Sequence, residues 1–183
     1  TTIINPFDGL LSRYFVTLDP VLNSSYEMAQ PITFAGDFEI EFEFSTTNTA
    51  SQPLLGDSHS TSMYFNMSAN IDVWISNVTH IFSYGSQTPH DGKLHKVKYK
   101  LTSTSLEVFL DGTSLGSQTI TPYTGANNFI IGSSNSVSAY FDGIIANVKF
   151  TDKSGASDVV TTFKLDNSPA ANNYTYSTEI LDN

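Results

Sequence analysis

The side chains best suited to binding a sugar lie in two neighbouring segments. Residues 62–67 and 71–76 alternate apolar and polar side chains, as strands with one buried and one solvent-facing side do. If Phe65 and Val73 point toward the core, the outward positions are Tyr64, Asn66, Asp72, Trp74 and Ser76. A sugar ring offers an apolar C–H face to an aromatic plane and hydroxyls to amides and carboxylates. We therefore expect a ligand-binding face with Trp74, the only tryptophan, as its stacking platform.

Trp74 also has a second interpretation, because an outward aromatic ring can be covered by a loop or by a neighbouring subunit. His80 and Tyr84 follow these segments closely enough to border the same face, and we include them among the ligand-binding candidates. The four histidines lack a close metal-ligand spacing, and no Ser-His-Asp order with a nucleophile turn is visible.

Composition and charge exclude several classes of partner. The 183 residues, 39% of them hydrophobic, fit a single domain spanning 1–183. Eight Lys and Arg against 18 Asp and Glu give a net charge of −10, which argues against nucleic acid as a partner. No apolar run approaches the roughly 18 residues that cross a bilayer, so we expect no membrane insertion. The absence of cysteine excludes disulfides and thiolate chemistry. Because the chain starts with Thr rather than Met, we expect a module of a longer chain.

The elements that must position these residues are strands, because apolar residues recur at every second position. In residues 37–44 three glutamates alternate with apolar residues, and in residues 94–101 three lysines do the same. Further strands are predicted at 106–112, 114–120, 129–132, 143–151 and 159–165, with a tight turn at Asp111-Gly112. About ten short strands with frequent turns predict a two-sheet sandwich or a barrel.

Four segments in order resemble the laminin-G-like, concanavalin A-like lectin/glucanase family. They are Asp91-Gly-Lys-Leu-His-Lys-Val-Lys-Tyr-Lys-Leu101, Leu106-Glu-Val-Phe-Leu-Asp-Gly112, Phe129-Ile-Ile-Gly132 and Tyr140-Phe-Asp-Gly-Ile-Ile-Ala-Asn-Val-Lys-Phe150. The resemblance covers most of residues 30–151. It implies an all-β jelly-roll sandwich of two antiparallel sheets, a fold often used as a carbohydrate-binding or adhesion module of surface proteins, secreted polysaccharide enzymes or phage spikes.

The same resemblance raises the question of catalysis on the acidic strand. Glucanases of this fold place Glu-x-Asp-x-Glu along one strand, with the outer carboxylates as nucleophile and acid/base, which would be Glu39 and Glu43 here. The middle residue is Glu41 instead, and only one tryptophan is available to build sugar subsites. The alternative is a ladder in which the glutamates pair with lysines such as Lys98 or Lys149 across strands. We favour the ladder, and thus a non-enzymatic domain.

A calcium site is the cofactor question that the resemblance poses. Many members carry a carboxylate in the last core strand, at the position that Ala146 occupies here. Calcium binds six to eight oxygens, which Asp37, Asp57 or Asp142 could supply together with backbone carbonyls. These three are the candidate metal ligands, and calcium is the candidate cofactor.

The leading hypothesis is a non-enzymatic module that binds a glycan or a cell-surface receptor, on an extracellular protein or a virion or phage spike. One alternative is a structural or assembly domain of a spike or adhesin, as a homo-oligomer or within a larger parent chain. A glycoside hydrolase or lyase that uses Glu39 and Glu43 is the third hypothesis.

Overall fold

The computed structural model describes residues 15–20, 25–28, 31–57, 63–123, 125–133, 139–165 and 174–182. Within these ranges the chain forms strands and no α-helix, as the two-residue periodicity predicted. The strands are β1 (Phe15–Leu18), β2 (Tyr26–Glu27), β3 (Ile32–Phe34), β4 (Phe38–Ser45), β5 (Gln52–Asp57), β6 (Met63–Met67), β7 (Asn70–Ile75), β8 (Val78–Ser83), β9 (His95–Leu101), β10 (Ser105–Leu110), β11 (Thr113–Thr119), β12 (Gly125–Asn127), β13 (Phe129–Ile131), β14 (Gly143–Asp152), β15 (Ser157–Leu165) and β16 (Tyr174–Asp182). No helix in these ranges is long and apolar enough to cross a membrane.

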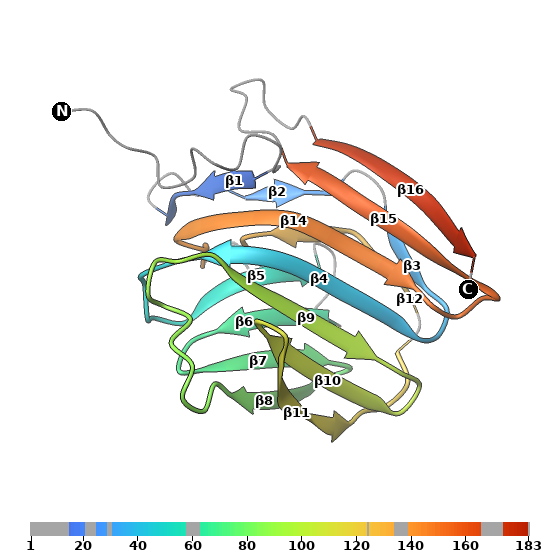
Figure 1. Ribbon diagram of the computed structural model, residues 1–183, viewed down its shortest axis with the longest axis horizontal. Coiled ribbons are helices and arrows are strands. Elements are labelled where there is room, and N and C mark those ends of the chain that lie inside the picture. Colours follow the sequence, from blue (N-terminus) through green and yellow to red (C-terminus); the bar gives the residue numbers. More distant parts are fainter. Residues whose placement is uncertain are drawn as a thin grey trace.

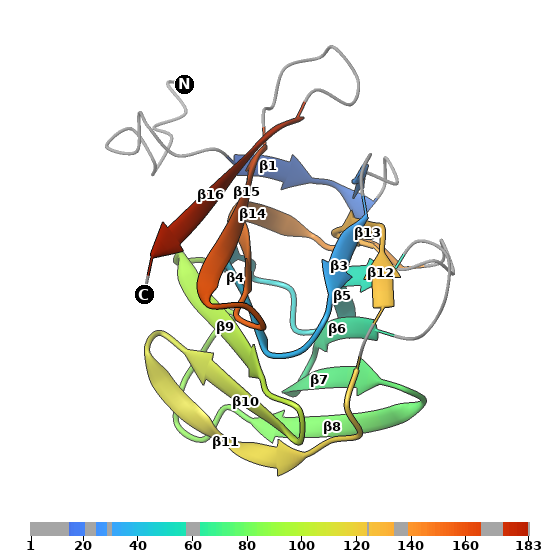
Figure 2. The same ribbon diagram turned by 90° about the vertical axis from the view of Figure 1, so that its right-hand side faces the viewer.

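Two antiparallel sheets make up most of the molecule (Figure 1). The eight-stranded sheet has the order β11-β10-β9-β4-β14-β15-β16, and β1 also pairs with β14. The six-stranded sheet has the order β2-β13-β5-β6-β7-β8, while β12 pairs with β3 separately. Strands β9, β10 and β11 lie across from β6, β7 and β8 (Figure 2). The predicted jelly-roll sandwich of two antiparallel sheets is confirmed.

The core lies between the two sheets, and strand alternation selects the residues that enter it. On β4, Phe42 is buried while its neighbours Glu41 and Glu43 are half-buried on the opposite face. On β6 and β9, the rings of Phe65 and Tyr99 meet across the core with centroids 4.4 Å apart. Burial of large apolar side chains contributes roughly 1.5–3 kcal/mol each, so this alternation is the main source of stability.

The edge strands β8 and β11 of the two sheets are linked by one side chain, Gln118. Its Nε2 donates a hydrogen bond to the Ile81 carbonyl oxygen at 2.7 Å, and its Oε1 lies 3.2 Å from His80 Nδ1. The two sheets therefore approach each other at this edge, where β8 and β11 lie close together in Figure 2.

Two-residue turns fix the β10–β11 and β7–β8 hairpins, one in each sheet. Asp111 and Gly112 both have positive φ (50° and 78°), which confirms the predicted tight turn between β10 and β11. Ser76 and Asn77 also have positive φ (50° and 66°) and join β7 to β8. Ser76 is therefore a turn residue and does not extend the outward face of β7, in contrast to the prediction.

His95 holds two loops to the start of β9 through both ring nitrogens. Its Nδ1 lies 2.7 Å from Asp111 Oδ2, and its Nε2 lies 3.0 Å from Asp91 Oδ1. Partial burial favours the neutral ring, but the hydrogen bonds and charges of the two carboxylates outweigh it and raise the pKa of His95 above 6.5.

This arrangement predicts a pH-dependent contribution to stability. Because the pKa is higher in the folded state than in the unfolded chain, the contribution is complete below pH 6.5 and disappears as pH rises through the folded-state pKa. As the pH rises above 6.5, the melting temperature of the unmodified protein should therefore show a decrease that the His95→Gln variant does not show. Identical pH profiles for the two proteins would contradict the assignment.

Candidate functional site

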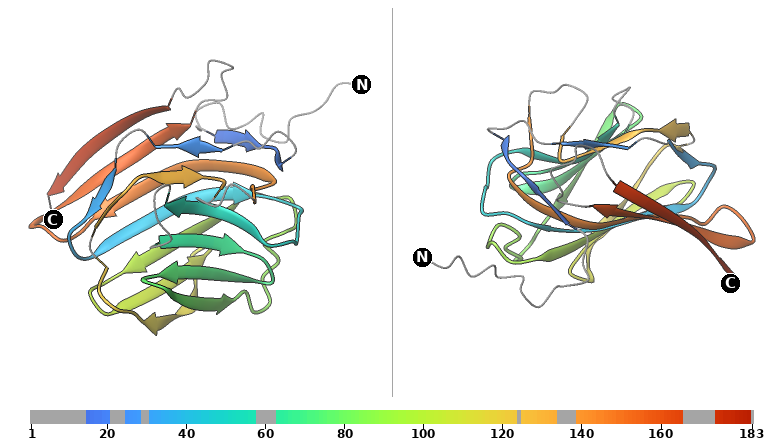
Figure 3. Two further views of the ribbon diagram at one scale, coloured as in Figure 1. Left: turned by 180° about the vertical axis from the view of Figure 1, so that it is seen from behind. Right: turned by 90° about the horizontal axis from the view of Figure 1, so that it is seen from above.

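The outer face of β6 and β7 brings four of the predicted site residues together. Tyr64 lies opposite Trp74, and Asn66 lies opposite Asp72, in the antiparallel register of the two strands. Residues directly opposite each other share a face and have Cβ atoms about 5 Å apart. Their chain neighbours, such as Phe65, are fully buried on the inner face. Figure 3 (left) shows this sheet from behind, with β5 to β8 facing the viewer.

Trp74 points outward as predicted but is not an open platform. The residue is half-buried, and its Nε1 atom is buried without a hydrogen-bond partner among the described residues. An unpaired buried donor costs roughly 1–3 kcal/mol. Part of the side chain thus remains exposed, while its polar edge is shielded from water.

Asn66 is almost completely buried, with 6% of its surface exposed, and it organises its neighbours. Its Oδ1 accepts a hydrogen bond from the Tyr64 hydroxyl at 3.1 Å, and its Nδ2 donates to Ser51 Oγ at 2.9 Å. Asn66 therefore positions the Tyr64 hydroxyl, and the direct ligand contact predicted for Asn66 stays a prediction. Ser51 was missed, because it lies in the loop before β5, a strand that the sequence pattern did not predict.

Asp72 is the half-buried carboxylate of this face. Burial raises its pKa above the usual 3.8, while hydrogen bonds from Asn66 and Ser68 partly offset that effect. Burial and the Asp72 charge together raise the pKa of Tyr64 to about 12. Tyr64 is thus a neutral phenol at physiological pH, and Asp72 is the acceptor that a ligand hydroxyl could meet.

His80 and Tyr84 do not lie on the Trp74 face. His80 is opposite Val73 in the β7–β8 register and is 94% buried on the inner side, where it contacts Gln118. The prediction overlooked the two-residue turn after β7, which places Thr79 rather than His80 opposite Trp74. Tyr84 is likewise in the hydrophobic core, and its hydroxyl donates to the Asn70 carbonyl oxygen at 2.9 Å.

Tyr84 instead lines a surface cleft of about 440 Å³ beside the β6–β7 turn, together with Ser68, Gln87, Pro89 and His90. His90 bridges two loops there, with Nδ1 2.7 Å from the Asn48 carbonyl oxygen and Nε2 2.9 Å from that of Ser68.

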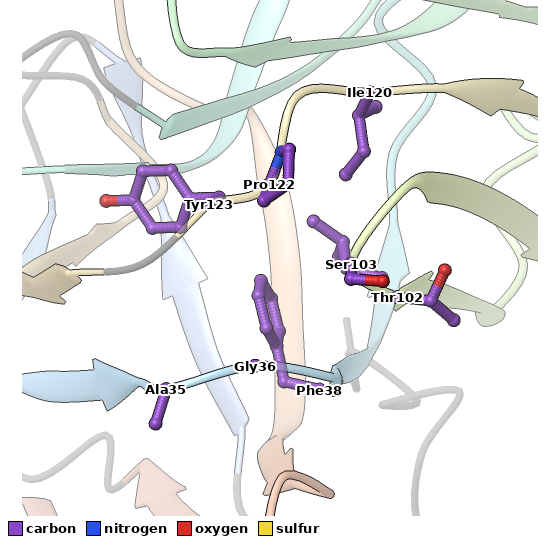
Figure 4. A pocket seen from close by; sticks show the side chains of 9 residues that line it. Ala35, Gly36, Phe38, Thr102, Ser103, Ile120, Pro122 and Tyr123 are labelled. Carbon is purple, nitrogen blue, oxygen red and sulfur yellow. The ribbon is translucent and has the colours of Figure 1, made fainter.

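A smaller hollow of about 150 Å³ lies beside the start of β4. Figure 4 shows its lining, with Phe38 directed between Ser103 and Tyr123. None of the predicted ligand-binding residues lines it. Its surroundings are mainly apolar, and it presents no charged side chain.

The glutamates of β4 form the predicted charge ladder on the outer face of the other sheet. The Glu41 carboxylate forms ion pairs with the Nζ atoms of Lys96 at 2.9 Å and Lys149 at 3.3 Å. The Glu39 carboxylate lies 4.0 Å from Lys98 Nζ. Partial burial opposes ionisation of Glu41, but the two lysines outweigh it and lower its pKa below 4.5. A general acid needs a raised pKa, so Glu41 is unsuited to that role.

Glu43 completes the row and accepts a hydrogen bond from Asn147 Nδ2 at 2.6 Å. Asn147 has a positive φ of 52° and forms the irregularity between β14 and β4, where the register shifts between Ala146 and Lys149. The Ala146-Asn147 pair that departs from the family's carboxylate position is thus the site of a β-bulge.

The three candidate metal ligands do not converge. Asp37 precedes β4, whereas Asp142 lies beside the other end of that strand, roughly 25 Å away at about 3.3 Å per residue. Asp57 is the last residue of β5 and lies opposite Phe129. It is five residues along the strand from Gln52, whose Oε1 accepts a hydrogen bond from the backbone N–H of Asp142. In the described part of the chain, no group of three or more His, Asp or Glu side chains could hold a metal ion. Each aspartate would have to bind calcium separately, with backbone carbonyls.

The antiparallel two-sheet sandwich defines the fold class to which the chain belongs. A laminin G-type family model, described as the concanavalin A-like lectin/glucanases superfamily, matches residues 26–160. The chain therefore belongs to this superfamily, which confirms the resemblance seen in the sequence. No curated protein sequence matches the chain.

Solved structures share the fold at low sequence identity. The LG1–3 region of the laminin alpha2 chain superposes with a TM-score of 0.62 at 20% identity, covering 75% of this chain and 26% of that one. A heptameric SAP-like pentraxin from Limulus polyphemus gives 0.62 at 9% identity, covering 93% and 94%. Domain 4 of AbnA, a GH43 extracellular arabinanase from Geobacillus stearothermophilus in complex with arabinotriose, gives 0.51 at 12%, covering 64% and 61%. The chain thus spans about a quarter of the laminin structure.

Proposed function

We propose that the domain is a non-enzymatic module that binds a glycan or a glycan-bearing cell-surface receptor through the outer face of β6 and β7. The observation that carries this proposal is the juxtaposition of Trp74, Tyr64 and Asp72 on neighbouring strands. A half-exposed ring beside a carboxylate and a phenol fits the two faces of a pyranose, one apolar and one rich in hydroxyls.

The supporting network makes this face preorganised. Asn66 is held by Ser51 and in turn holds the Tyr64 hydroxyl and Asp72. Side chains that are fixed before binding lose less conformational entropy when the ligand arrives. The extracellular arabinanase domain that shares this fold was solved with arabinotriose, which supports a carbohydrate as the ligand class.

The engagement of the acidic row supports the proposal that the domain is not an enzyme. Lys96 and Lys149 hold Glu41 in its ionised form, and Asn147 donates a hydrogen bond to the Glu43 carboxylate. Glycoside hydrolysis needs one carboxyl that is protonated at working pH and one that is free to attack or activate water. We propose that this row is structural, and that the domain acts on the outside of a cell or virion as part of a longer protein, with calcium as an optional ligand.

The test is a glycan-array screen of the purified domain, run with calcium and again with a chelator. We expect binding that Trp74→Ala weakens by more than about 1 kcal/mol, or about fivefold, because the stacking plane is lost. Trp74→Phe, which keeps an aromatic ring, should retain most of the affinity. Lys100→Ala, on the opposite sheet, is the control and should bind normally.

Thermal melts of the variants separate loss of contact from loss of fold, because the half-buried Trp74 ring also packs against the sheet. A Trp74→Ala protein that melts cooperatively and still binds every glycan would contradict the proposal. Loss of binding in the chelator would add a calcium requirement to it.

A second candidate function is assembly with copies of the same or a parent protein, which the β8 edge favours. Val78 and Ile81 are 50% and 56% exposed, and Ile81 shares the outward face with Asp72. Exposed apolar side chains beside an aromatic ring are typical of a subunit contact. We would then expect the molecular mass in solution to increase with protein concentration, and Ile81→Ser to return it to the monomer value. This result would support assembly over glycan binding.

A further inference from the structure

The lysines in the described part of the chain are separated from the candidate binding face. The six-stranded sheet has no lysine or arginine in any of its strands, whereas it carries Glu27, Asp57 and Asp72. Five lysines instead belong to strands of the eight-stranded sheet: Lys96, Lys98, Lys100, Lys149 and Lys164. The described cations outside the sheets are Lys93 and Lys153, and each is paired, with Asp91 and Asp158 respectively.

No lysine or arginine in the described strands of this sheet offsets Asp72. The groups that respond to its charge are the phenols of Tyr64, Tyr84 and Tyr99, all of which it pushes toward the neutral form. The neighbours on the same face are neutral as well: Tyr64, Asn66, Trp74, Thr79, Ile81 and Ser83. The face is thus an aromatic surface with one uncompensated negative charge.

The hydrogen-bonding capacity of the face is equally one-sided. Tyr64 already donates its proton to Asn66, and one Asn66 N–H is already donated to Ser51. Trp74 Nε1 is buried. Apart from the neutral hydroxyls of Thr79 and Ser83, what the face offers a ligand is the acceptor capacity of the Asp72 carboxylate, which hydroxyl donors can satisfy and anionic oxygens cannot.

We infer that this face, if it is the binding face proposed above, selects uncharged, hydroxyl-rich glycans and rejects glycans that carry carboxylate or sulfate groups. Two hydroxyls of a neutral pyranose can donate to Asp72 while the ring stacks on Trp74. A sulfate or uronate held about 6 Å from Asp72 is instead repelled, and at an effective dielectric constant near 40 the repulsion lowers affinity about tenfold.

The experiment compares polymers that share a backbone but differ in charge: dextran with dextran sulfate, hydroxyethyl cellulose with carboxymethyl cellulose, and methyl-esterified with de-esterified homogalacturonan. Binding is measured in a chelating buffer, so that no divalent cation neutralises Asp72. We expect at least one neutral polymer to bind, and its anionic counterpart to bind at least about tenfold more weakly at low salt. Raising the salt concentration should narrow the difference, because the repulsion is screened.

Asp72→Asn is the matched variant, since it removes the charge and keeps the shape. It should bring the two members of a pair to within about threefold of each other, while Trp74→Ala should still weaken the binding of both by more than about fivefold. Tighter, Trp74-dependent binding of an anionic polymer than of its neutral counterpart would overturn the selectivity while leaving the proposed binding face in place. If every polymer still binds the Trp74→Ala variant as it binds the unmodified protein, or if no polymer binds the unmodified protein, the proposed face and the selectivity are both refuted.

Discussion

Replacing Gly143 with alanine is expected to lower the free energy of unfolding by about 3–5 kcal/mol. Gly143 has a φ of 150°, a backbone conformation that residues with a Cβ rarely adopt. An added Cβ would overlap the Ser45 carbonyl oxygen and lie 3.0 Å from the Phe141 ring. The clashing oxygen belongs to the backbone of Ser45, the last residue of the central strand β4. The clash can therefore be relieved only by separating β14 from β4.

Gly112→Ala is the matched control for this experiment. Gly112 also has a positive φ (78°), but no atom beyond its two chain neighbours lies within 4 Å of an added Cβ. Its substitution should therefore cost only the backbone strain, about 1–2 kcal/mol. Urea unfolding monitored by circular dichroism gives both values. Equal losses for the two variants would show that the contact between Gly143 and Ser45 does not limit the approach of the strands.

Tyr99→Phe should stabilise the protein, by about 1–2 kcal/mol. The Tyr99 side chain is completely buried between the sheets, against Phe65 and Phe42, and its hydroxyl has no hydrogen-bond partner among the described residues. An unsatisfied buried hydroxyl retains its full desolvation cost. Phenylalanine keeps the ring contacts and removes that cost.

The same chemical change at Tyr84 should have the opposite sign. The Tyr84 hydroxyl donates a hydrogen bond to the Asn70 carbonyl oxygen at 2.9 Å. Tyr84→Phe should therefore destabilise the protein by about 1 kcal/mol. Midpoints of denaturant unfolding for the two variants provide the comparison. If Tyr99→Phe is also destabilising, the Tyr99 hydroxyl is satisfied by a group such as an internal water molecule.

Strict alternation located β4 and β9 closely, whereas β5 and β8 were missed. β4 and β9 have apolar residues at every second position and were predicted to within one residue of their observed ends. β5 was missed because Pro53 and Gly56 disfavour a strand, although the fold tolerates Pro53 beside an irregular register shift. β8 was missed because its outward side carries the apolar Ile81, which hides the alternation.

The candidate site was predictable where it depends on alternation alone. The pairs Tyr64–Trp74 and Asn66–Asp72 follow from two adjacent strands and a short connection. The burial of Asn66 and the contribution of Ser51 depend on how a third strand approaches, which no local pattern encodes. His80 was assigned to the wrong face because a two-residue turn shifts the alternation by one position.

The measurement that tests the central claim most directly uses Trp74 as its own reporter, because it is the only tryptophan in the chain. The protein is titrated with a neutral glycan retained on the array, while tryptophan emission and binding heat are followed in parallel. If the outer face of β6 and β7 binds the glycan, the emission changes and saturates with the dissociation constant that calorimetry gives. Calorimetric binding with unchanged Trp74 emission would contradict the account and place the ligand elsewhere on the domain.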